Sequence, residues 1–359
     1  MNQMIARILF GSSLILGSML YSQAGIVFNL IDGGGAGAGT QAQLGFQRAA
    51  DFWSRTLADN ISVNINVSMA NLSPGILGGT SSNFGSVSYS GYRNSVLGRR
   101  VSANDFTFAN NLPSGPSFSV YINRTSDNPN GSLSATPYVD NDGGANNTTV
   151  TMTFANAKAL GLLDPKNSSL DARIQFSTNY AYDYDPSDGI TSGKLDFVAI
   201  ATHEIGHALG FISGVDDLDY SGSASHPANY YDSVTPLDFM RFSTASRAAG
   251  ANIDWTADNR TKYFSIDGGK TVSQDNAWSL GVHFGDGRQA SHWKDNLNRG
   301  LMDPTLGSGE KGVVTTLDLR AFDLLGYTLS SDVPEPTSAA IFLSSLLAFQ
   351  AIRARKRRE

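Results

Sequence analysis

Hydrophobic side chains recur along this chain with two different spacings, and each spacing predicts one type of element. Between residues 40 and 58 the apolar positions lie three and four residues apart, which predicts an amphipathic helix. These positions are Phe46, Ala50, Trp53 and Leu57. Residues 61–68 and 172–178 alternate apolar with polar side chains, which predicts two half-buried strands. Weaker alternation predicts further strands at 118–122 and 149–154.

Two more helices are predicted from their apolar periodicity and their end signals. One runs from Asp196 to Leu209 and ends at Gly210. The other is short, with Thr316 as its capping residue and Gly326 at its end. The chain between these helices is rich in Asp, Ser and Gly and reads mainly as loop.

This order of elements predicts an α+β fold. Residues 25–210 would form an N-terminal subdomain with a mixed, twisted sheet and the helix over 196–209 crossing beneath it. Residues 211–329 would form a loop-rich C-terminal subdomain that closes a cleft.

Glycines cluster near the start of this region, at Gly33, Gly34, Gly35, Gly37 and Gly39. A phosphate-binding loop needs a strand before such glycines and a Lys-Ser/Thr pair after them. No such pair follows, and no sufficiently long strand is predicted before them, so we interpret the segment as a flexible lead-in.

The first 24 residues predict export. Arg7 precedes an apolar run over 8–20, and Ser22-Gln23-Ala24 provides small residues for cleavage. This is the pattern of a secretory signal peptide, which is removed from the mature protein.

The last 30 residues, 330–359, predict a second sorting signal. Pro334-Glu335-Pro336 is followed by an apolar stretch over 337–352 and then by a basic cluster at the end. This arrangement resembles the PEP-CTERM tail of Gram-negative bacteria. The resemblance implies a short transmembrane segment that holds the chain transiently in the inner membrane. It also implies an exosortase that removes the tail, with release to the cell surface or the extracellular matrix.

Composition narrows the possible chemistry. The 359 residues carry a formal net charge of -6, which provides no basic surface for nucleic acid, so nucleic-acid binding is not expected. No cysteine is present, which excludes disulfides, thiolate ligands and cysteine nucleophiles. Only five histidines and four glutamates occur, against 28 aspartates.

Two of the histidines and one of the glutamates lie together on the predicted helix 196–209. His203-Glu204-Ile205-Gly206-His207 has the pattern His-Glu-x-x-His, which chance would produce roughly once in a thousand sequences of this composition. Histidines four residues apart on a helix share one face and can bind one zinc ion. Glu204 is then placed to act as the general base toward a water molecule.

A catalytic zinc site needs a third protein ligand. In metzincins, which the motif resembles, Gly and then His follow at fixed spacing; Gly210 is present, but Ser213 occupies the final position. A glutamate ligand from a second helix is disfavoured because Glu310 lies in a glycine-rich loop and Glu335 in the tail. The remaining candidates are His226, His283, His292, Asp216 and Asp217.

We choose His292, with His283 as the alternative, because of the residues that follow it. Ser291-His292-Trp293 precedes Leu301-Met302-Asp303-Pro304, which resembles the Met-turn of metzincins. Together with the helix sequence HEIGHALGF, this order resembles leishmanolysins, in which an inserted segment displaces the third histidine. The resemblance implies that His203, His207 and His292 bind zinc, that Glu204 is the catalytic base and that Met302 forms a hydrophobic floor. Unlike leishmanolysins, the chain has no cysteine and no evident long propeptide.

Two further features have a weaker basis. Asp183, Asp185 and Asp188 are spaced like the start of a calcium loop, although the closing glutamate is missing and Asp in turns needs no ion. The strand over 172–178 is expected at a sheet edge, where the metzincin resemblance implies pairing with an extended substrate.

The sequence thus predicts an exported zinc endopeptidase that acts on proteins or peptides. One alternative is a surface or matrix protein with a structural or inactive zinc site. Another is a different zinc hydrolase, such as an amidase acting on cell-wall peptides. Glu204 favours catalysis, because a purely structural site has no use for a carboxylate beside its ligands.

Overall fold

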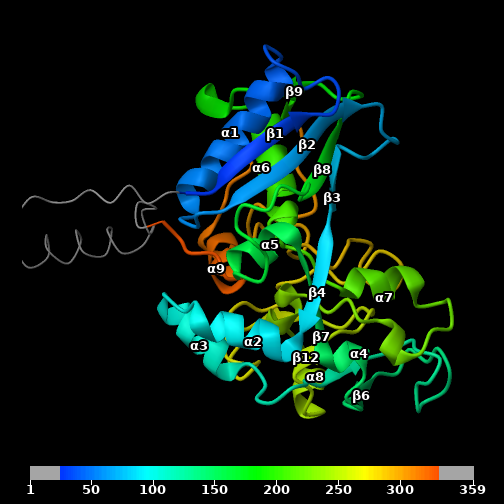
Figure 1. The fold of residues 1–359 in the computed structure, drawn as a ribbon. Coiled ribbons are helices and arrows are strands. Elements are labelled where there is room, and N and C mark those ends of the chain that lie inside the picture. Colours follow the sequence, from blue (N-terminus) through cyan, green and yellow to red (C-terminus); the bar gives the residue numbers. More distant parts are fainter. Residues whose placement is uncertain (1–24, 331–359) are drawn as a thin grey trace, which may run out of the picture.

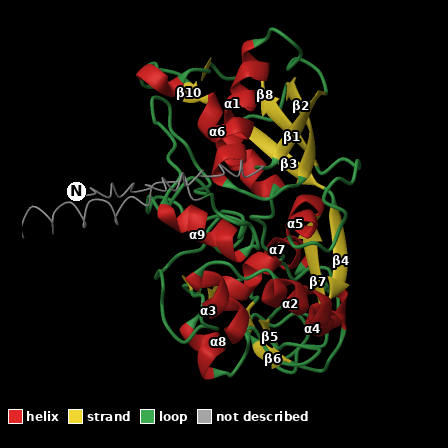
Figure 2. Ribbon diagram, turned by 60° about the vertical axis from the view of Figure 1, so that its left-hand side comes forward, coloured by secondary structure: helices red, strands yellow, loops and turns green. Residues whose placement is uncertain are grey.

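A computed structural model describes residues 25–330, which form a mixed α and β structure with several small sheets (Figures 1 and 2). The predicted signal peptide, residues 1–24, and the predicted sorting tail from residue 331 onward lie outside the described residues.

The strands are β1 (Val27–Asp32), β2 (Ser62–Ala70), β3 (Gly78–Ser82), β4 (Phe84–Ser88), β5 (Val120–Ile122), β6 (Tyr138–Asp140), β7 (Thr149–Thr153), β8 (Ala172–Ser177), β9 (Tyr182–Asp183), β10 (Leu195–Asp196), β11 (Arg241–Phe242), β12 (Ile253–Asp254) and β13 (Tyr263–Phe264). The α-helices are α1 (Gln41–Thr56), α2 (Tyr89–Gly98), α3 (Ala103–Asn111), α4 (Ala145–Thr148), α5 (Phe154–Ala159), α6 (Phe197–Ala208), α7 (Val215–Ser221), α8 (Thr244–Ala248) and α9 (Thr316–Leu324). Short 3-10 turns lie at Pro186–Asp188, Ala228–Tyr230 and Pro236–Met240.

The largest sheet has the order β1-β2-β8-β3. β1, β2 and β8 run parallel, and β3 runs antiparallel at the edge. Both ribbon views place α1 and α6 on the same face of this sheet (Figures 1 and 2). The apolar residues Val63, Ile65 and Val67 of β2 are buried, as its period-two pattern predicts, and Asn64 and Ser68 on the opposite face are buried as well.

α1 forms where the apolar spacing predicts a helix. Thr40 caps it by accepting a hydrogen bond from the Gln43 backbone, and Phe46, Ala50 and Trp53 are buried along one face. The Trp53 indole donates to the Thr202 carbonyl of α6 at 2.9 Å, so the two helices are joined by a buried hydrogen bond as well as by packing.

α6 is fixed at both ends. The Asp196 side chain accepts a hydrogen bond from the Ala199 backbone at 2.9 Å and caps the start. At the other end Gly210 has a φ of 109°, in the left-handed region that favours glycine. Near the start Phe197 packs edge-on against Phe46, with ring centroids 4.9 Å apart. The helix that carries the His-Glu-x-x-His motif is therefore held firmly under the sheet.

The β9–β10 pair lies near the top of the main sheet, and most of the remaining chain forms smaller sheets and long loops below it (Figures 1 and 2). β5 pairs with both β6 and β12, β4 with β7, β11 with β13 and β9 with β10. β5 precedes residue 210 and β12 follows it, so one sheet contains strands from both predicted subdomains. The division of the chain into two subdomains near residue 210 stays a prediction. Within the described residues, the chain from 265 to 315 forms no helix and only isolated bridges.

Strand β3 continues almost directly into β4, with only Asn83 between them. The Asn83 backbone N–H donates to Asp171, and its carbonyl accepts from Phe154, so the junction is itself paired. Figure 1 shows this run passing from the main sheet into the lower part of the molecule.

Three sequence-based expectations are wrong. The strand over 172–178 is β8, which lies inside the sheet between β2 and β3, because β3 covers its outer side. The glycine segment does follow a strand, β1, and the Asp32 carboxylate orders it by accepting from the Gly34 and Ala36 backbones. The last helix is capped by Thr315 rather than Thr316.

The predicted transmembrane segment is also corrected. No helix within residues 25–330 is long and apolar enough to cross a membrane. The apolar stretch over 337–352, on which that prediction rested, lies outside the described residues.

The contact between α1 and α6 can be tested at Gly45. A Cβ at this position would lie 2.3 Å from Cδ1 of Phe197. We expect Gly45→Ala to lower the free energy of unfolding by about 1–3 kcal/mol through overpacking, measured by chemical denaturation. Gly98→Ala is the matched control, because nothing lies within 4 Å of its Cβ position, and it should be neutral or slightly stabilising. Equal effects of both substitutions would contradict this packing.

Candidate metal centre

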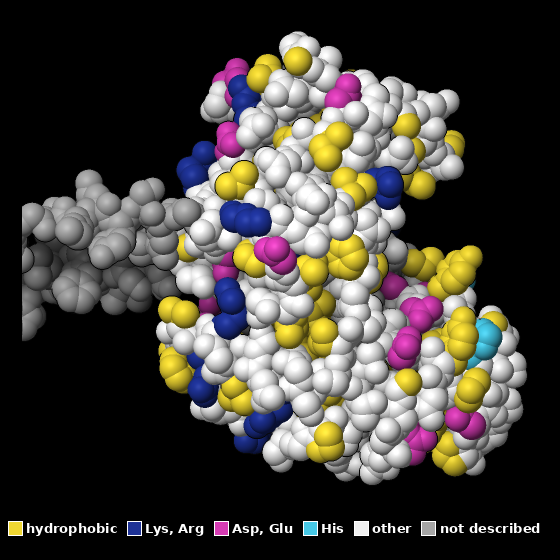
Figure 3. All heavy atoms as spheres, in the orientation of Figure 1, with side chains coloured by type: hydrophobic (Ala, Val, Ile, Leu, Met, Phe, Trp, Pro, Cys, Tyr) yellow, Lys and Arg dark blue, Asp and Glu magenta, His cyan; other side chains and the backbone are white. Residues whose placement is uncertain are grey.

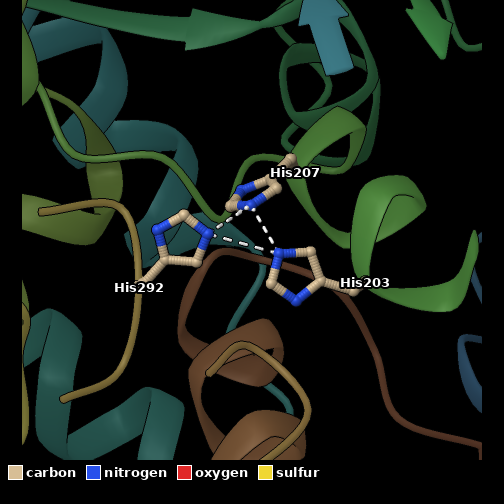
Figure 4. Close-up of side chains that lie close together, drawn as sticks. All are labelled: His203, His207 and His292. Atoms are coloured by element: carbon tan, nitrogen blue, oxygen red, sulfur yellow. Dashed lines mark hydrogen bonds between the residues drawn. The ribbon is translucent and has the colours of Figure 1, made fainter. Parts of the chain in front are cut away.

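The two motif histidines project from one side of α6 (Figure 4). His203 and His207 are one helical turn apart, and their Nε2 atoms lie 3.0 Å from each other.

The third histidine at this point is His292, which arrives on the long loop between β13 and α9 (Figure 4). Its Nε2 lies 3.1 Å from that of His207 and 3.3 Å from that of His203. His283 lies elsewhere, with Nδ1 3.3 Å from Asp219, and His226 stacks on Tyr230 with centroids 3.6 Å apart. The structure therefore brings together the three histidines predicted from sequence and leaves the alternative His283 outside.

Backbone carbonyls fix the orientation of the three rings. His203 Nδ1 is 2.8 Å from the Leu301 carbonyl, His207 Nδ1 is 2.7 Å from that of Phe211, and His292 Nδ1 is 3.3 Å from that of Gln289. A carbonyl can only accept, so each Nδ1 carries the hydrogen and each neutral ring presents the lone pair of Nε2. Three lone pairs facing one point repel each other unless a cation lies between them.

The surroundings keep two of these rings neutral. Burial, reinforced by the neighbouring His203, lowers the pKa of His207 to about 3. Burial together with His207 and His203 lowers the pKa of His292 well below its usual value. Neutral imidazole is the form that binds a metal ion, so the centre is prepared for one at ordinary pH.

The spacing fits a single ion. Ligands of a tetrahedral zinc ion with bonds of about 2.0–2.1 Å lie about 3.3 Å apart, close to the three Nε2 separations. Within residues 25–330, these three histidines are the only group of three or more potential ligands close enough to hold a metal ion. The three histidines are therefore close enough together to bind one metal ion.

Glu204 lies beside the centre on the same helix. Its side chain is buried, and the Thr80 hydroxyl of β3 lies 2.7 Å from Oε2. Burial raises the pKa of Glu204, while the charge of His203 and the hydrogen bond from Thr80 oppose the rise. Such a carboxyl group can exchange protons with a ligand in the cleft.

Met302 lies under the centre. Its side chain is fully buried, and a Cβ added to Gly206, between the motif histidines, would lie 2.7 Å from the Met302 sulfur. Gly206 therefore allows the close approach that brings this turn against α6.

The sequence reasoning missed the residue that fixes this turn, Asp318. Its carboxylate accepts hydrogen bonds from the backbones of Leu301 and Met302 at 2.8 and 3.2 Å and from the Trp293 indole at 2.8 Å. The available signal was the capping box formed by Thr315 and Asp318 at the start of α9. Sequence alone showed a helix cap but not the long-range contacts.

The aspartates considered as ligands have other partners. Asp216 accepts from the Ala290 backbone at 2.6 Å, and Asp217 accepts from the Ser233 hydroxyl at 2.9 Å. The predicted calcium loop is closed by its own donors: Asp183 accepts from the backbones of Asp185 and Thr191 at 3.0 and 2.9 Å. Nothing in this arrangement supports calcium there.

The histidines open into a cleft of about 1080 Å³. Figure 3 shows the surface indented between the part carrying the main sheet and the part carrying α7. The cleft is lined by the edge strand β3, by α6 and by the loop after Met302; lining residues include Gly79, Thr80, His203, Glu204, His292 and Leu301. Its floor is thus the histidine centre, and one wall is a strand edge.

Comparisons with protein-family models, with curated proteins and with solved structures found no match to this chain.

The third ligand can be tested directly. We expect His292→Ala to weaken Zn²⁺ binding by more than about 100-fold, measured by competition with a chromophoric chelator, because one of three donors is lost. His283→Ala serves as the matched control and should leave the affinity unchanged. The reverse pattern would identify His283 as the ligand.

Proposed function

We propose that this protein is an exported zinc-dependent endopeptidase with a metzincin-like catalytic domain. The observation that carries the proposal is the convergence of three histidines with Glu204 beside them on the floor of a cleft. Zinc is the proposed metal because three imidazoles with one open position are typical of catalytic zinc sites. When bound, zinc supplies the Lewis acidity that polarises a carbonyl and acidifies water.

Glu204 provides the proton transfer. Its carboxylate takes a proton from the attacking water and delivers it to the departing amine. The Thr80 hydroxyl lies 2.7 Å from Oε2 and 2.9 Å from the Glu204 carbonyl, and its hydrogen bond to Oε2 holds the carboxylate against β3. A structural zinc site would not need this arrangement, which favours catalysis over the matrix-protein alternative.

The edge strand β3 provides a way to hold a peptide. Its inner side is paired with β8, whereas no strand of the described chain pairs with its outer side. Gly78, Gly79 and Thr80 line the cleft, and nothing lies within 4 Å of the Cβ position of Gly79. An extended substrate can add to this edge by main-chain hydrogen bonds, which recognise a polypeptide independently of its side chains.

The position of His292 supports the proposed resemblance of the site to that of leishmanolysins. It joins the helix histidines from 85 residues away and is followed by a buried Met302 beneath them. Export to the cell surface or extracellular matrix, and processing by an exosortase, rest on residues 1–24 and on the tail, both outside the described residues.

Substitution of the base tests the proposal. We expect the purified protein to degrade an unfolded protein substrate, to lose activity with a chelator and to regain it with Zn²⁺. Glu204→Gln should lower kcat by about 100- to 10,000-fold while the zinc content stays at one per chain. Full activity of Glu204→Gln would exclude its role as base. Absence of cleavage by a zinc-loaded protein would favour a structural site or a narrowly specific zinc hydrolase such as a cell-wall amidase.

Thr80 provides a second test. Thr80→Val removes the hydroxyl at nearly constant volume and should lower kcat by about 10- to 100-fold, since a hydrogen bond to a charged group is lost. KM and zinc content should change little, and Thr80→Ser should restore most of kcat. Equal impairment of the Val and Ser variants would point to a packing role instead.

A further inference from the structure

The chain leaves α6 through Gly210 and reaches Ser213, the position at which the uninterrupted motif would carry its last histidine. The Ser213 backbone N–H donates to the Ser291 hydroxyl at 2.9 Å. Ser291 is the residue before His292, although it lies 78 positions later in the sequence. The loop that contains His292 is thus hydrogen-bonded to Ser213, the position where a contiguous motif would have its third histidine.

A buried carboxylate completes this attachment. Asp216, in the first turn of α7, accepts hydrogen bonds from the Ala290 backbone at 2.6 Å, from the Ser291 backbone at 3.1 Å and from the Ser291 hydroxyl. Both backbone donors immediately precede His292. A charged acceptor with three donors is a strong restraint on a segment that has no regular secondary structure.

The backbone segment that precedes Asp216 is itself held in place. Asp238 accepts from the Ser213 hydroxyl at 2.6 Å and from the Gly214 backbone at 3.0 Å, and it also accepts from the Trp255 indole at 3.0 Å. Asp216 therefore follows a segment that Asp238 holds in place, and its carboxylate binds the loop over residues 290–291. The position of that loop depends on this segment.

His292 has greater need of such support than the other two ligands. His203 and His207 are held by α6 and by carbonyl contacts of 2.8 and 2.7 Å, whereas the carbonyl contact of His292 is 3.3 Å. Its backbone belongs to the irregular segment between residues 265 and 315. On its C-terminal side the His292 carbonyl accepts from the Ser279 backbone at 3.1 Å, and on its N-terminal side the position of the ring depends on residues 289–291.

We propose that Asp216 is the positioning residue for the third metal ligand. Its carboxylate holds residues 290 and 291 so that His292 Nε2 meets those of His203 and His207. The inference rests on the metal centre of the proposed function but not on peptide hydrolysis.

The experiment measures metal binding by the purified protein. We expect Asp216→Asn to weaken Zn²⁺ binding by about 10- to 100-fold in competition with a chromophoric chelator, as for other residues that orient a ligand. The visible absorption of the Co²⁺-loaded variant should also change, because the coordination of the ion changes. Asp217→Asn is the matched control: it alters the adjacent residue of α7 by the same charge, its carboxylate contacts Ser233, and it should leave affinity and spectrum unchanged.

A double-mutant cycle separates positioning from general destabilisation. In a His292→Ala background, Asp216→Asn should cause no further loss of Zn²⁺ affinity, because the ligand that it positions is gone. Full additivity of the two losses, or wild-type affinity and spectrum in folded Asp216→Asn, would overturn the proposal.

If Asp216→Asn does not fold, Ser291→Ala decides in its place. It removes only the hydroxyl that joins Asp216 to Ser213, and it should weaken Zn²⁺ binding by a few-fold, again only when His292 is present; unchanged affinity would overturn the proposal. A protein that binds Zn²⁺ as described but cleaves no substrate would contradict the proposed function and leave this inference standing.

Discussion

Three nitrogen lone pairs directed at one point impose the main constraint on this structure. Without a cation they repel, so the protein must hold the three rings in place by other means. For two of them the means is a helix that is capped at its start, ended by a glycine and packed beside α1 on one face of the main sheet. For the third it is a loop, which is fixed by hydrogen bonds to buried carboxylates.

Buried aspartates provide those contacts. Asp216, Asp238 and Asp318 each accept from several donors, which in each case include backbone N–H groups of segments without regular structure. Aspartate suits this task because its short side chain reaches nearby backbone groups and loses little conformational freedom when fixed. The chain has 28 aspartates and only four glutamates, which is consistent with a loop-rich domain held together by such anchors.

Local patterns predicted the regular elements that have strong periodicity. The helices over α1, α6 and α9 and the strands β2 and β8 lie where apolar spacing placed them, to within a few residues. β3 escaped prediction because it reads Gly-Gly-Thr-Ser-Ser, with no apolar side chain to alternate. For the same reason β8 was wrongly placed at the sheet edge. Elements made of small polar residues depend on partners distant in sequence, and one chain does not reveal those partners.

Some residues of the candidate site could likewise be predicted from local sequence and others could not. His203 and His207 could be predicted from the helix alone, because residues four apart on a helix lie on the same face. His292 was found through the order of neighbouring residues, and the structure places it with the other two. The roles of Asp216, Asp318 and Thr80 could not be predicted, because each acts through contacts that span 74, 16 and 124 residues respectively. The continuity of β3 and β4 has one further consequence: the main sheet, whose edge forms one wall of the cleft, is joined to the lower part of the molecule by a paired, extended backbone with no free residue between the two strands. A hinge at this crossing would have to break strand pairing, so we expect the cleft entrance to keep a constant width. Under the proposed function, substrates would then enter as unfolded segments rather than as folded domains.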